Sequence, residues 1–448
     1  MTANLTRRSA LSALGASALA LTLAACSGSG DDSKPAAEVD PSAAAAAAEA
    51  GGELLVWSWE PTLTDVVAEY QRAFPNVKVE LVNAGTGTEQ YTALQNAVSA
   101  GSGIPDVAQI EYYALPQFSL AESLADLTQF GAADLAASYS AGPWAAVASD
   151  SGIFGLPMDS GPVALFYNEE VFNAAGVQVP TTWEEYLDAA RAIHAADPKQ
   201  YIANDIGDAV KTLSLLWQAG SRPYTVDGTT VGIDFSEESS QKYAELWTTL
   251  IEEELLYPCA DWSDEWYRGL GDGTIASLAM GAWMPASFVG GVEAGAGKWR
   301  VAPLPAWKAG ETASSEMGGS SLAVTAASGK QALAYHFIEY ANAGAGVASR
   351  IANGAFPATT ADLTSEEFLG AEFEYFGGQK ANEVFAESAA AVTDGWSFLP
   401  FQAYANSIFN DSVGKAYESK GATSVADGLS AWQQACITYG NQQGFTVS

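Results

Sequence analysis

Cysteine and histidine are rare in this chain: its 448 residues include 3 cysteines and 2 histidines. The histidines, His194 and His336, stand far apart, each within a helical pattern. No group of Cys and His has the spacing of metal ligands, so we expect no metal and no other cofactor. Neither histidine stands in a motif typical of a catalytic triad, which disfavours that class of enzyme.

Positive charge is also scarce, because 19 Lys and Arg stand against 53 Asp and Glu, for a formal net charge of -34. The first 26 residues hold two arginines and no acid, so removing them would change the net charge from -34 to -36. A surface of that charge repels nucleic acid and anionic lipid, and it disfavours phosphate-rich ligands. Aromatic rings, in contrast, are plentiful, with 13 Trp, 18 Tyr and 18 Phe.

Long apolar runs are limited to one, at the N-terminus. Arg7 and Arg8 precede an uncharged Ala/Leu-rich run at 11–23, which is short for a membrane span and typical of a signal peptide. The Leu-Ala-Ala-Cys that ends at Cys26 resembles the bacterial lipobox, in which the cysteine becomes the lipidated N-terminus of the mature protein. We therefore predict a lipoprotein signal peptide at 1–26. The arginine pair also resembles a twin-arginine export signal, which leaves the export route open.

Residues 27–52 are rich in Gly, Ser, Ala, Pro and acids. Such a segment buries too little apolar surface to offset the entropy of ordering it, so we expect a flexible tether. A lipid anchor, a tether and a globular body indicate a protein displayed on the cell surface. The body is roughly 400 residues long, which suits two domains.

Strand and helix patterns alternate along the start of the body, and this order predicts an α/β fold with a parallel sheet. The predicted elements are a strand at 53–59, a helix at 62–74, a strand at 77–82, a helix at 91–100 and a strand at 106–110. The unbroken apolar run 163–167 predicts a fully buried strand. Before it, Pro157 and Pro162 bracket a polar kink, which we interpret as the passage from one domain to the next.

Several short motifs follow one another over the whole body. They are Leu-Val-Trp-Ser-Trp at 55–59, Gly-Ile-Pro-Asp-Val at 103–107, Gly-Leu-Pro at 155–157, Pro-Thr-Thr-Trp-Glu-Glu at 180–185 and Gly-Ala-Trp at 281–283. This order resembles the extracellular solute-binding proteins of carbohydrate importers, the maltose-binding-protein-like family 1. Within it, Thr182 and Glu185 also have the spacing of a helix capping box.

The resemblance implies a two-domain, periplasmic-binding-protein-like α/β clamp with a ligand cleft between its lobes. It implies three chain crossings, which we expect near 157–162, 301–308 and 353–360. The N-terminal lobe would comprise 53–157 and 306–355, and the C-terminal lobe 158–305 and 356–448. The implied function is carbohydrate binding without chemistry, for delivery to the permease subunits of an ABC importer. We expect a monomer, lipid-anchored on the extracellular face of the cell membrane.

Sugars present apolar CH faces and many hydroxyls, which aromatic rings and polar side chains can match. We look for such residues at strand ends and in the loops of the expected cleft. The predicted ligand-binding residues are Trp59, Glu60, Glu111, Tyr112, Tyr113, Asp159, Gly161, Asp208, Trp283, Gly319, Trp396 and Phe398. Asp205 is a further candidate beside Asp208, whereas Trp57, which alternates with Trp59, is assigned to the core.

Two other functions stay open at this point. A surface glycoside hydrolase needs only a pair of carboxylates, and acids are abundant here. A cationic ligand such as a polyamine would also suit acids and aromatic rings. Cys259 and Cys436 either form a disulfide, as exported proteins permit, or stay two separate buried thiols. The kind of sugar, its linkage and its length do not follow from the sequence.

Overall fold

The structure is a computed structural model that describes residues 40–149 and 151–448. The predicted signal peptide and its Cys26 therefore lie outside the described residues. Within the described ranges, no helix is both long and apolar enough to cross a membrane.

A five-stranded sheet organises the first lobe. Its strand order is β2-β1-β3-β14-β6. β1 pairs in parallel with β2 and β3, which confirms the predicted parallel sheet, while β14 runs antiparallel to both β3 and β6. The strands are β1 (Gly52–Trp57), β2 (Val77–Val82), β3 (Val107–Glu111), β6 (Leu156–Pro157) and β14 (Ser320–Val324).

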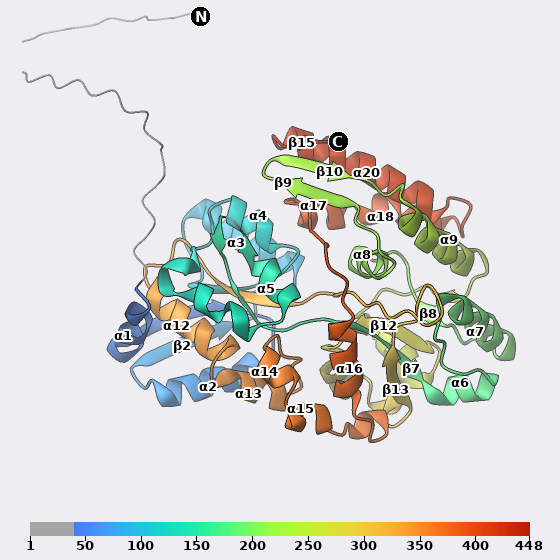
Figure 1. Cartoon of the computed structure of the whole chain (residues 1–448), viewed down its shortest axis with the longest axis horizontal. Helices are drawn as coiled ribbons and strands as arrows, with labels where there is room; N and C mark the ends of the chain where they lie inside the picture. The colour runs from blue at the N-terminus through green and yellow to red at the C-terminus, as the bar shows by residue number, and fades with distance from the viewer. Residues whose placement is uncertain (1–39, 150) are drawn as a thin grey trace, which may run out of the picture. The chain divides into compact units, whose positions relative to one another are not determined.

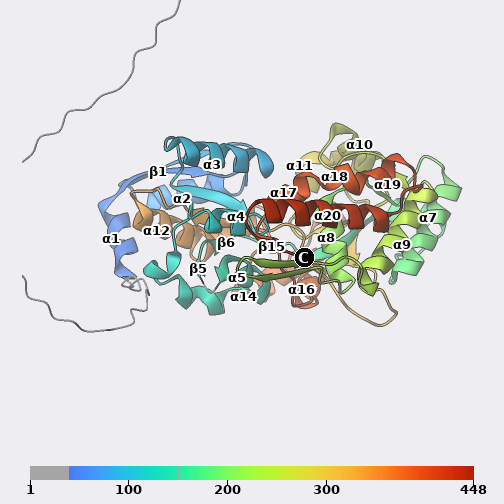
Figure 2. The ribbon, with the colours of Figure 1, turned by 90° about the horizontal axis from the view of Figure 1, so that it is seen from above.

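Helices cover both faces of this sheet. Val56 belongs to a buried cluster with residues of α2 (Leu63–Ala73) and α12 (Gln331–Asn342). Ile110 belongs to another, with residues of α3 (Thr88–Ala100) and α4 (Leu115–Leu120). Figure 2 shows α3 and α12 on opposite sides of β1. The carboxyl ends of β1 and β3 are left uncovered by these helices, and the predicted residues 59–60 and 111–113 stand there.

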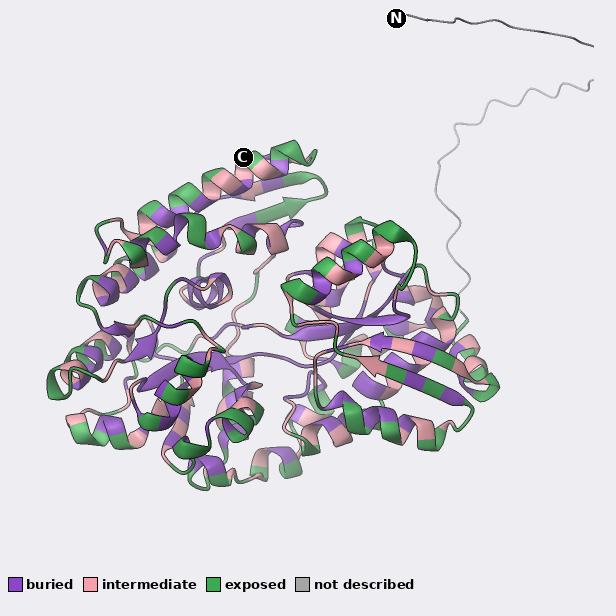
Figure 3. Ribbon diagram, turned by 180° about the vertical axis from the view of Figure 1, so that it is seen from behind, coloured by how far each residue is buried: buried purple, intermediate pink, exposed green. Residues whose placement is uncertain are grey.

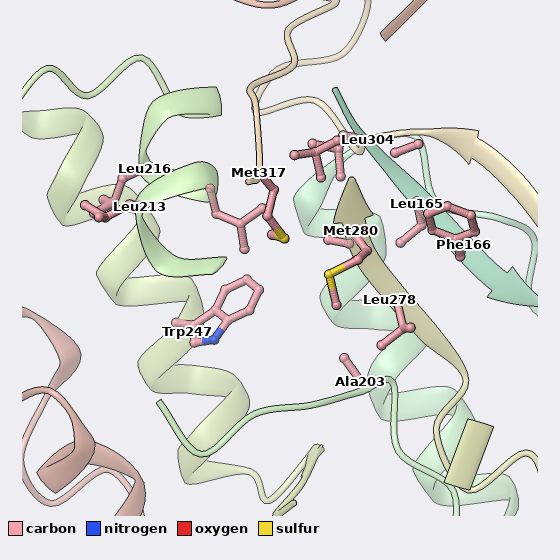
Figure 4. Close-up of a cluster of buried hydrophobic side chains, with 14 of the residues drawn as sticks. Leu165, Phe166, Ala203, Leu213, Leu216, Trp247, Leu278, Met280, Leu304 and Met317 are labelled. Atoms are coloured by element: carbon pink, nitrogen blue, oxygen red, sulfur yellow. The ribbon is translucent and has the colours of Figure 1, made fainter. Parts of the chain in front are cut away.

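A three-stranded antiparallel sheet organises the second lobe, in the order β12-β7-β13. Its strands are β7 (Val163–Asn168), β12 (Ser277–Gly281) and β13 (Trp299–Pro303). All but one residue of β7 are buried, which confirms the strand predicted from the apolar run. Figure 4 shows part of the core beside this sheet, where Met317 lies between the helix that carries Leu213 and Leu216 and the strand that carries Met280.

The remaining elements mostly surround these two sheets. The other strands are β4 (Ala148–Ser149), β5 (Gly152–Ile153), β8 (Ala203–Asn204), β9 (Tyr224–Asp227), β10 (Thr230–Ile233), β11 (Leu256–Tyr257) and β15 (Thr446–Val447). The other α-helices are α1 (Ser42–Ala50), α5 (Ala141–Val147), α6 (Glu169–Ala175), α7 (Trp183–Ala196), α8 (Ala209–Gln218), α9 (Glu238–Glu252), α10 (Asp264–Asp272), α11 (Met284–Gly291), α13 (Gly346–Ala352), α14 (Thr360–Leu363), α15 (Glu366–Gly370), α16 (Ala381–Ala390), α17 (Gln402–Ser407), α18 (Phe409–Ser412), α19 (Gly414–Glu418) and α20 (Val425–Gln442). Short 3-10 helices are η1 (Leu127–Phe130), η2 (Ala132–Ser138), η3 (Glu293–Gly295) and η4 (Glu374–Phe376). Figure 3 shows buried residues filling the central strands, while the outer helices alternate between buried and exposed residues.

The predicted tether at 27–52 is wrong for its last part. Residues 42–50 form α1, in which Ala44 and Ala48 are buried against the first lobe. Alanine has the highest helix propensity, and its small side chain lets two helices approach closely. Figure 1 shows α1 beside α12, so this segment belongs to the folded body.

Other expectations have mixed outcomes. The capping box of α7 is confirmed, since the Thr182 hydroxyl accepts from Glu185 N while the Glu185 carboxylate accepts from Thr182 N, each at 3.2 Å. Trp57 is only partly buried and packs against the same cluster as Trp59. Assigning Trp57 alone to the core was wrong, because residues two apart in an extended segment point to the same face of the sheet. Cys259 and Cys436 are both buried and unbonded, so the structure has two separate thiols.

Two segments join the two sheets, and the three crossings stay predictions. β6 ends at Pro157 on the edge of the first sheet, and β7 starts at Val163 in the second. β13 ends at Pro303 in the second sheet, and β14 starts at Ser320 in the first. The exact lobe boundaries remain predictions.

Candidate ligand-binding site

One pocket is lined by side chains from both lobes. Tyr113 follows β3 of the first lobe, and Phe398 packs against the same lobe's cluster. Trp217 lies on α8, and Trp396 packs against the core of the second lobe. Glu316, Gly318 and several residues of α8 and α17 complete the lining: Val210, Leu213, Ser214 and Asn406. Three of the predicted ligand-binding residues, Tyr113, Trp396 and Phe398, thus converge on one pocket.

The pocket is small as it stands, since the space open to the centre of a water molecule is about 20 Å³. One water molecule needs about 10–15 Å³ of such space. Two larger hollows, of about 440 and 410 Å³, gather none of the predicted ligand-binding residues. We take the small pocket as the candidate site because aromatic side chains from both lobes and one acid, Glu316, line it.

The aromatic wall of the pocket is a stack of rings. Trp396 lies on Trp217 with ring centroids 5.1 Å apart and an interplanar angle of 2°. Phe398 meets Trp396 edge-on at 6.2 Å, and it packs against the first lobe's cluster around Tyr91 and Tyr113. Trp217 Nε1 donates to the carbonyl of Thr393 at 2.6 Å, which ties α8 to the loop that carries Trp396. These rings offer flat apolar surface to a ligand.

Two acids from different lobes lie near the pocket. Glu111 ends β3 and exchanges two hydrogen bonds of 2.9 Å with the Tyr91 hydroxyl. Asp208 caps α8 and accepts from Lys211 N at 2.7 Å. Burial raises the pKa of Glu111, and the negative charge of Asp208 raises this pKa further. Burial likewise raises the pKa of Asp208, although the charge of Lys211 opposes the shift.

Trp283 stands next to this pocket. It follows β12, is partly buried, and donates from Nε1 to the carbonyl of Met317 at 2.8 Å. Its indole fits against glycines: a Cβ built at Gly281 would collide with the ring, and one at Gly318 would lie 3.4 Å from Nε1. Gly318 in turn lines the pocket, so Trp283 supports its wall.

The predicted residues Tyr112, Asp159, Gly161 and Gly319 form a buried joint between the segments that link the sheets. The Tyr112 hydroxyl donates to the carbonyl of Asp159 at 2.6 Å, and its ring leaves no room for a Cβ at Gly319, which has φ +90. Asp159 accepts from Ser320 N at 2.6 Å. These four residues thus contact one another and the segment at 316–320, and none of them lines the pocket.

Two carboxyl groups at this joint have pKa values raised above the usual range. Burial raises the pKa of Asp159 to about 7; the charge of Arg350 opposes this shift and that of Glu60 adds to it. Glu316 accepts from Gly161 N at 2.6 Å and from the Ser160 hydroxyl at 3.0 Å. Burial raises the pKa of Glu316 to about 7 against these hydrogen bonds, and the charge of Asp159 raises it further.

The remaining predicted residues are engaged locally. Trp59 packs against Tyr91 at 6.2 Å, and Glu60 accepts from Thr62 N at 3.2 Å. Asp205 is buried and accepts from the Trp247 indole at 2.8 Å and the Tyr417 hydroxyl at 2.9 Å. Asp208 therefore fits a ligand contact better than Asp205. Among the described residues, no group of three or more His, Cys, Asp and Glu could hold a metal ion.

The sequence reasoning missed Glu316 and Trp262 and did not single out Trp217. Glu316 reaches the pocket because β14 pairs antiparallel with β3, a long-range pairing that no local pattern reveals. Trp217 has a local signal, since it sits on the apolar helix that follows Asp208. Trp262, in Asp-Trp-Ser at 261–263, has no signal in the sequence beyond its type.

A sequence profile of the bacterial extracellular solute-binding proteins matches residues 57–348. The chain therefore belongs to this family of extracellular, exported binding proteins. Since these are binding proteins, the chain is not an enzyme, and the glycoside hydrolase alternative is set aside.

Relatives and solved structures agree with this assignment. The arabinooligosaccharide-binding protein of Halalkalibacterium halodurans is 27% identical over 305 residues, which cover 65% of this chain and 68% of that protein. The ABC-transporter-associated binding protein of B. animalis subsp. lactis, solved with β-1,6-galactobiose, is 44% identical with a TM-score of 0.83, and the match covers 88% of this chain and 99% of that one. The galacto-N-biose-/lacto-N-biose I-binding protein of Bifidobacterium longum, solved with lacto-N-biose, is 25% identical with a TM-score of 0.76, covering 89% and 99%. The two-lobed clamp predicted from the motifs is confirmed by these structures.

Proposed function

We propose that this protein binds a short, uncharged oligosaccharide in the pocket between its lobes and delivers it to the permease of an ABC importer. The names of the similar proteins support the ligand class, since they mention arabinooligosaccharides, β-1,6-galactobiose and lacto-N-biose. Two of these are disaccharides that contain galactose, so short galactosides are the first ligands to test.

The observation that carries the proposal is the convergence of Tyr113, Trp396 and Phe398 on one pocket with Glu316. Aromatic rings suit the CH faces of a sugar, and carboxylates accept hydrogen bonds from its hydroxyls. None of the described lysines and arginines is among the residues that line the pocket. Arg222 lies beside the aromatic wall and donates to the carbonyls of Trp217 at 3.2 Å and of Asp394 at 2.8 Å. Lys211 is buried and paired with Asp261. An anionic ligand would therefore meet acids and no free cation in the described part of the pocket.

The test is a calorimetric panel on the purified protein with β-1,6-galactobiose, lacto-N-biose, arabinotriose and spermidine. We expect binding of at least one sugar and none of spermidine. Binding of spermidine alone would favour the cationic ligand that the acidic surface also permits. Absence of binding to every sugar contradicts the proposal.

We also propose that the mature protein begins at Cys26, is lipid-anchored on the extracellular face of the cell membrane, and is a monomer. The Leu-Ala-Ala-Cys motif at 23–26 supports the anchor. A Cys26→Ser precursor is expected to stay uncleaved or to be released into the medium. Unchanged processing and membrane association of this variant would contradict the anchor.

The proposed lobes are 53–157 with 306–355, and 158–305 with 356–448, joined by crossings near 157–162, 301–308 and 353–360. The separation of strands into two sheets supports this division. Closure about such hinges is a common motion of two-lobed binding proteins. A ligand would then enter while the lobes are apart and be enclosed when they meet.

A further inference from the structure

Trp262 combines two features that are uncommon together. Its side chain is exposed, at 49% relative accessibility, in a protein whose other tryptophans are buried or partly buried within the described residues. Its backbone has φ +66, in the left-handed region that bulky side chains rarely adopt. Such a conformation persists only where the surrounding structure holds it, and it is concentrated at functional sites.

The loop that carries Trp262 is anchored by a buried polar network on the residues that precede Trp262. Asp261 forms an ion pair of 3.1 Å with Lys211, and both side chains are at most 10% exposed. Asn204 donates to the Asp261 carboxylate at 2.5 Å and to the carbonyl of Cys259 at 3.1 Å. Because the neighbours of Trp262 are fixed in this way, its backbone is fixed as well.

The other side of the loop is held by α10. The Ser263 hydroxyl accepts from Trp266 N at 3.1 Å, which caps the helix, and donates to the carbonyl of Ala260 at 2.8 Å. The Trp262 ring leans on the buried ring of Trp266, with centroids 5.0 Å apart. One side of the indole is thus supported by protein while much of the rest stays open to solvent.

The same ring touches Trp283. Their centroids are 5.8 Å apart and their planes differ by 32°, so the two indoles are in direct, tilted contact. The Trp283 indole donates a hydrogen bond to the carbonyl of Met317. The residues before and after Met317 in the chain, Glu316 and Gly318, line the candidate pocket. Trp262 does not line the pocket itself; it is exposed, and its contact with Trp283 connects it to the wall of the pocket.

We propose that Trp262 is an outer stacking site that binds the third unit of an oligosaccharide whose first unit occupies the pocket. This inference rests on the proposed function and adds a determinant of ligand length to it. An exposed ring held rigidly loses little conformational freedom when a sugar stacks on it, so its contact adds to the affinity. Shorter ligands do not reach the ring.

The experiment compares affinities for β-1,6-galactobiose and β-1,6-galactotriose by calorimetry. Trp262→Ala is expected to weaken binding of the trisaccharide at least about fivefold and that of the disaccharide at most about twofold. Trp262→Phe keeps a ring and is expected to retain most of the trisaccharide affinity. Trp307→Ala is the matched control, because this partly buried tryptophan stacks on Trp183 and contacts neither Trp262 nor Trp283.

Folding is monitored by the melting temperature, and Trp262→Gly provides a second ring deletion, since glycine accepts the positive φ without strain. If wild-type protein binds both sugars and neither ring deletion changes the trisaccharide affinity, the inference is overturned while the proposed function stands. Equal losses for both sugars would put the ring at an inner position and also overturn the inference. If the wild-type protein binds no sugar of the larger panel, the proposed function fails, and this inference fails with it.

Discussion

At the scale of single residues, two carboxyl groups at the buried joint beside the pocket resist ionisation. Asp159 and Glu316 lie on the two segments that link the sheets, and each has its pKa raised to about 7, chiefly by burial. In an unfolded chain the pKa values of these groups are near 4. Between about pH 4 and pH 7 the folded protein therefore holds more protons at these sites than the unfolded chain.

Their contribution to the free energy of unfolding is consequently present below about pH 4 and is lost as the pH rises through about 7. Asp159→Asn removes one of the two titrations while keeping an oxygen for Ser320 N. We expect the stability of this variant, relative to wild type, to improve as the pH is raised from 5 to 8. Urea unfolding of both proteins at several pH values measures the difference between their free energies of unfolding. A difference that does not vary with pH would contradict the raised pKa of Asp159.

Trp283 offers a second test at this scale. Replacing it with alanine removes ring surface next to the pocket, so affinity for the bound sugar is expected to fall about tenfold or more, or ~1.4 kcal/mol. The structure adds a cost to folding, because the Met317 carbonyl loses its donor, which is worth about 1–3 kcal/mol for a buried group. Calorimetry and thermal melting of Trp283→Ala and Trp283→Phe measure both effects.

Trp283→Phe lacks the indole N–H and keeps a ring, so it is expected to lose stability while retaining more affinity than Trp283→Ala. Equal affinity in all three proteins would remove Trp283 from the ligand site. Trp283→Ala with unchanged melting temperature would show that the hydrogen bond to Met317 contributes little.

At the scale of elements, α1 is part of the folded body, with one face buried. Ala48 is 1% exposed, whereas Ala45 on the same helix is exposed. Ala48→Glu would bury an unpaired charge or detach the helix, and a loss of ~1–3 kcal/mol in the free energy of unfolding is expected. Ala45→Glu is the matched control and should change stability by no more than about 0.5 kcal/mol. Equal melting temperatures for the two variants would mean that α1 does not stabilise the protein.

Elements with a strong local pattern were predicted well. The alternation at 77–82 corresponds to β2, the apolar run at 163–167 to β7, and the capping box to the start of α7. Each of these signals depends on neighbouring residues only. α1 was missed as a packed helix because its partner, α12, is supplied by residues almost three hundred positions further on.

The candidate site was predictable only in part, for the same reason. Tyr113, Trp396 and Phe398 were found from residue type and from their places after a strand and in a loop. Glu316 depends on the antiparallel pairing of β14 with β3, and the left-handed backbone of Trp262 depends on the Lys211–Asp261 ion pair. These are contacts between distant segments, which a single sequence does not display.

At the scale of the whole folded body, residues 40–448, the small pocket implies motion. A space of about 20 Å³ does not admit a disaccharide, so the lobes have to separate before a sugar enters. We expect small-angle X-ray scattering of the ligand-free protein to give a radius of gyration larger than that of residues 40–448 in this structure. Saturation with a bound sugar should reduce it. An unchanged radius with and without ligand would mean that entry needs only local side-chain movement.

The glycines around Trp283 bear on how ligand preference could be redesigned. Gly161, Gly281 and Gly318 come from three separate segments, and a side chain at Gly161 or Gly281 would collide with the Met317 carbonyl or with the indole. Substitutions at Gly161 or Gly281 would cause misfolding, so they could not give a folded variant with a new ligand preference. A mutant library aimed at new sugars should therefore leave this backbone cradle unchanged and diversify the exposed positions 262 and 394.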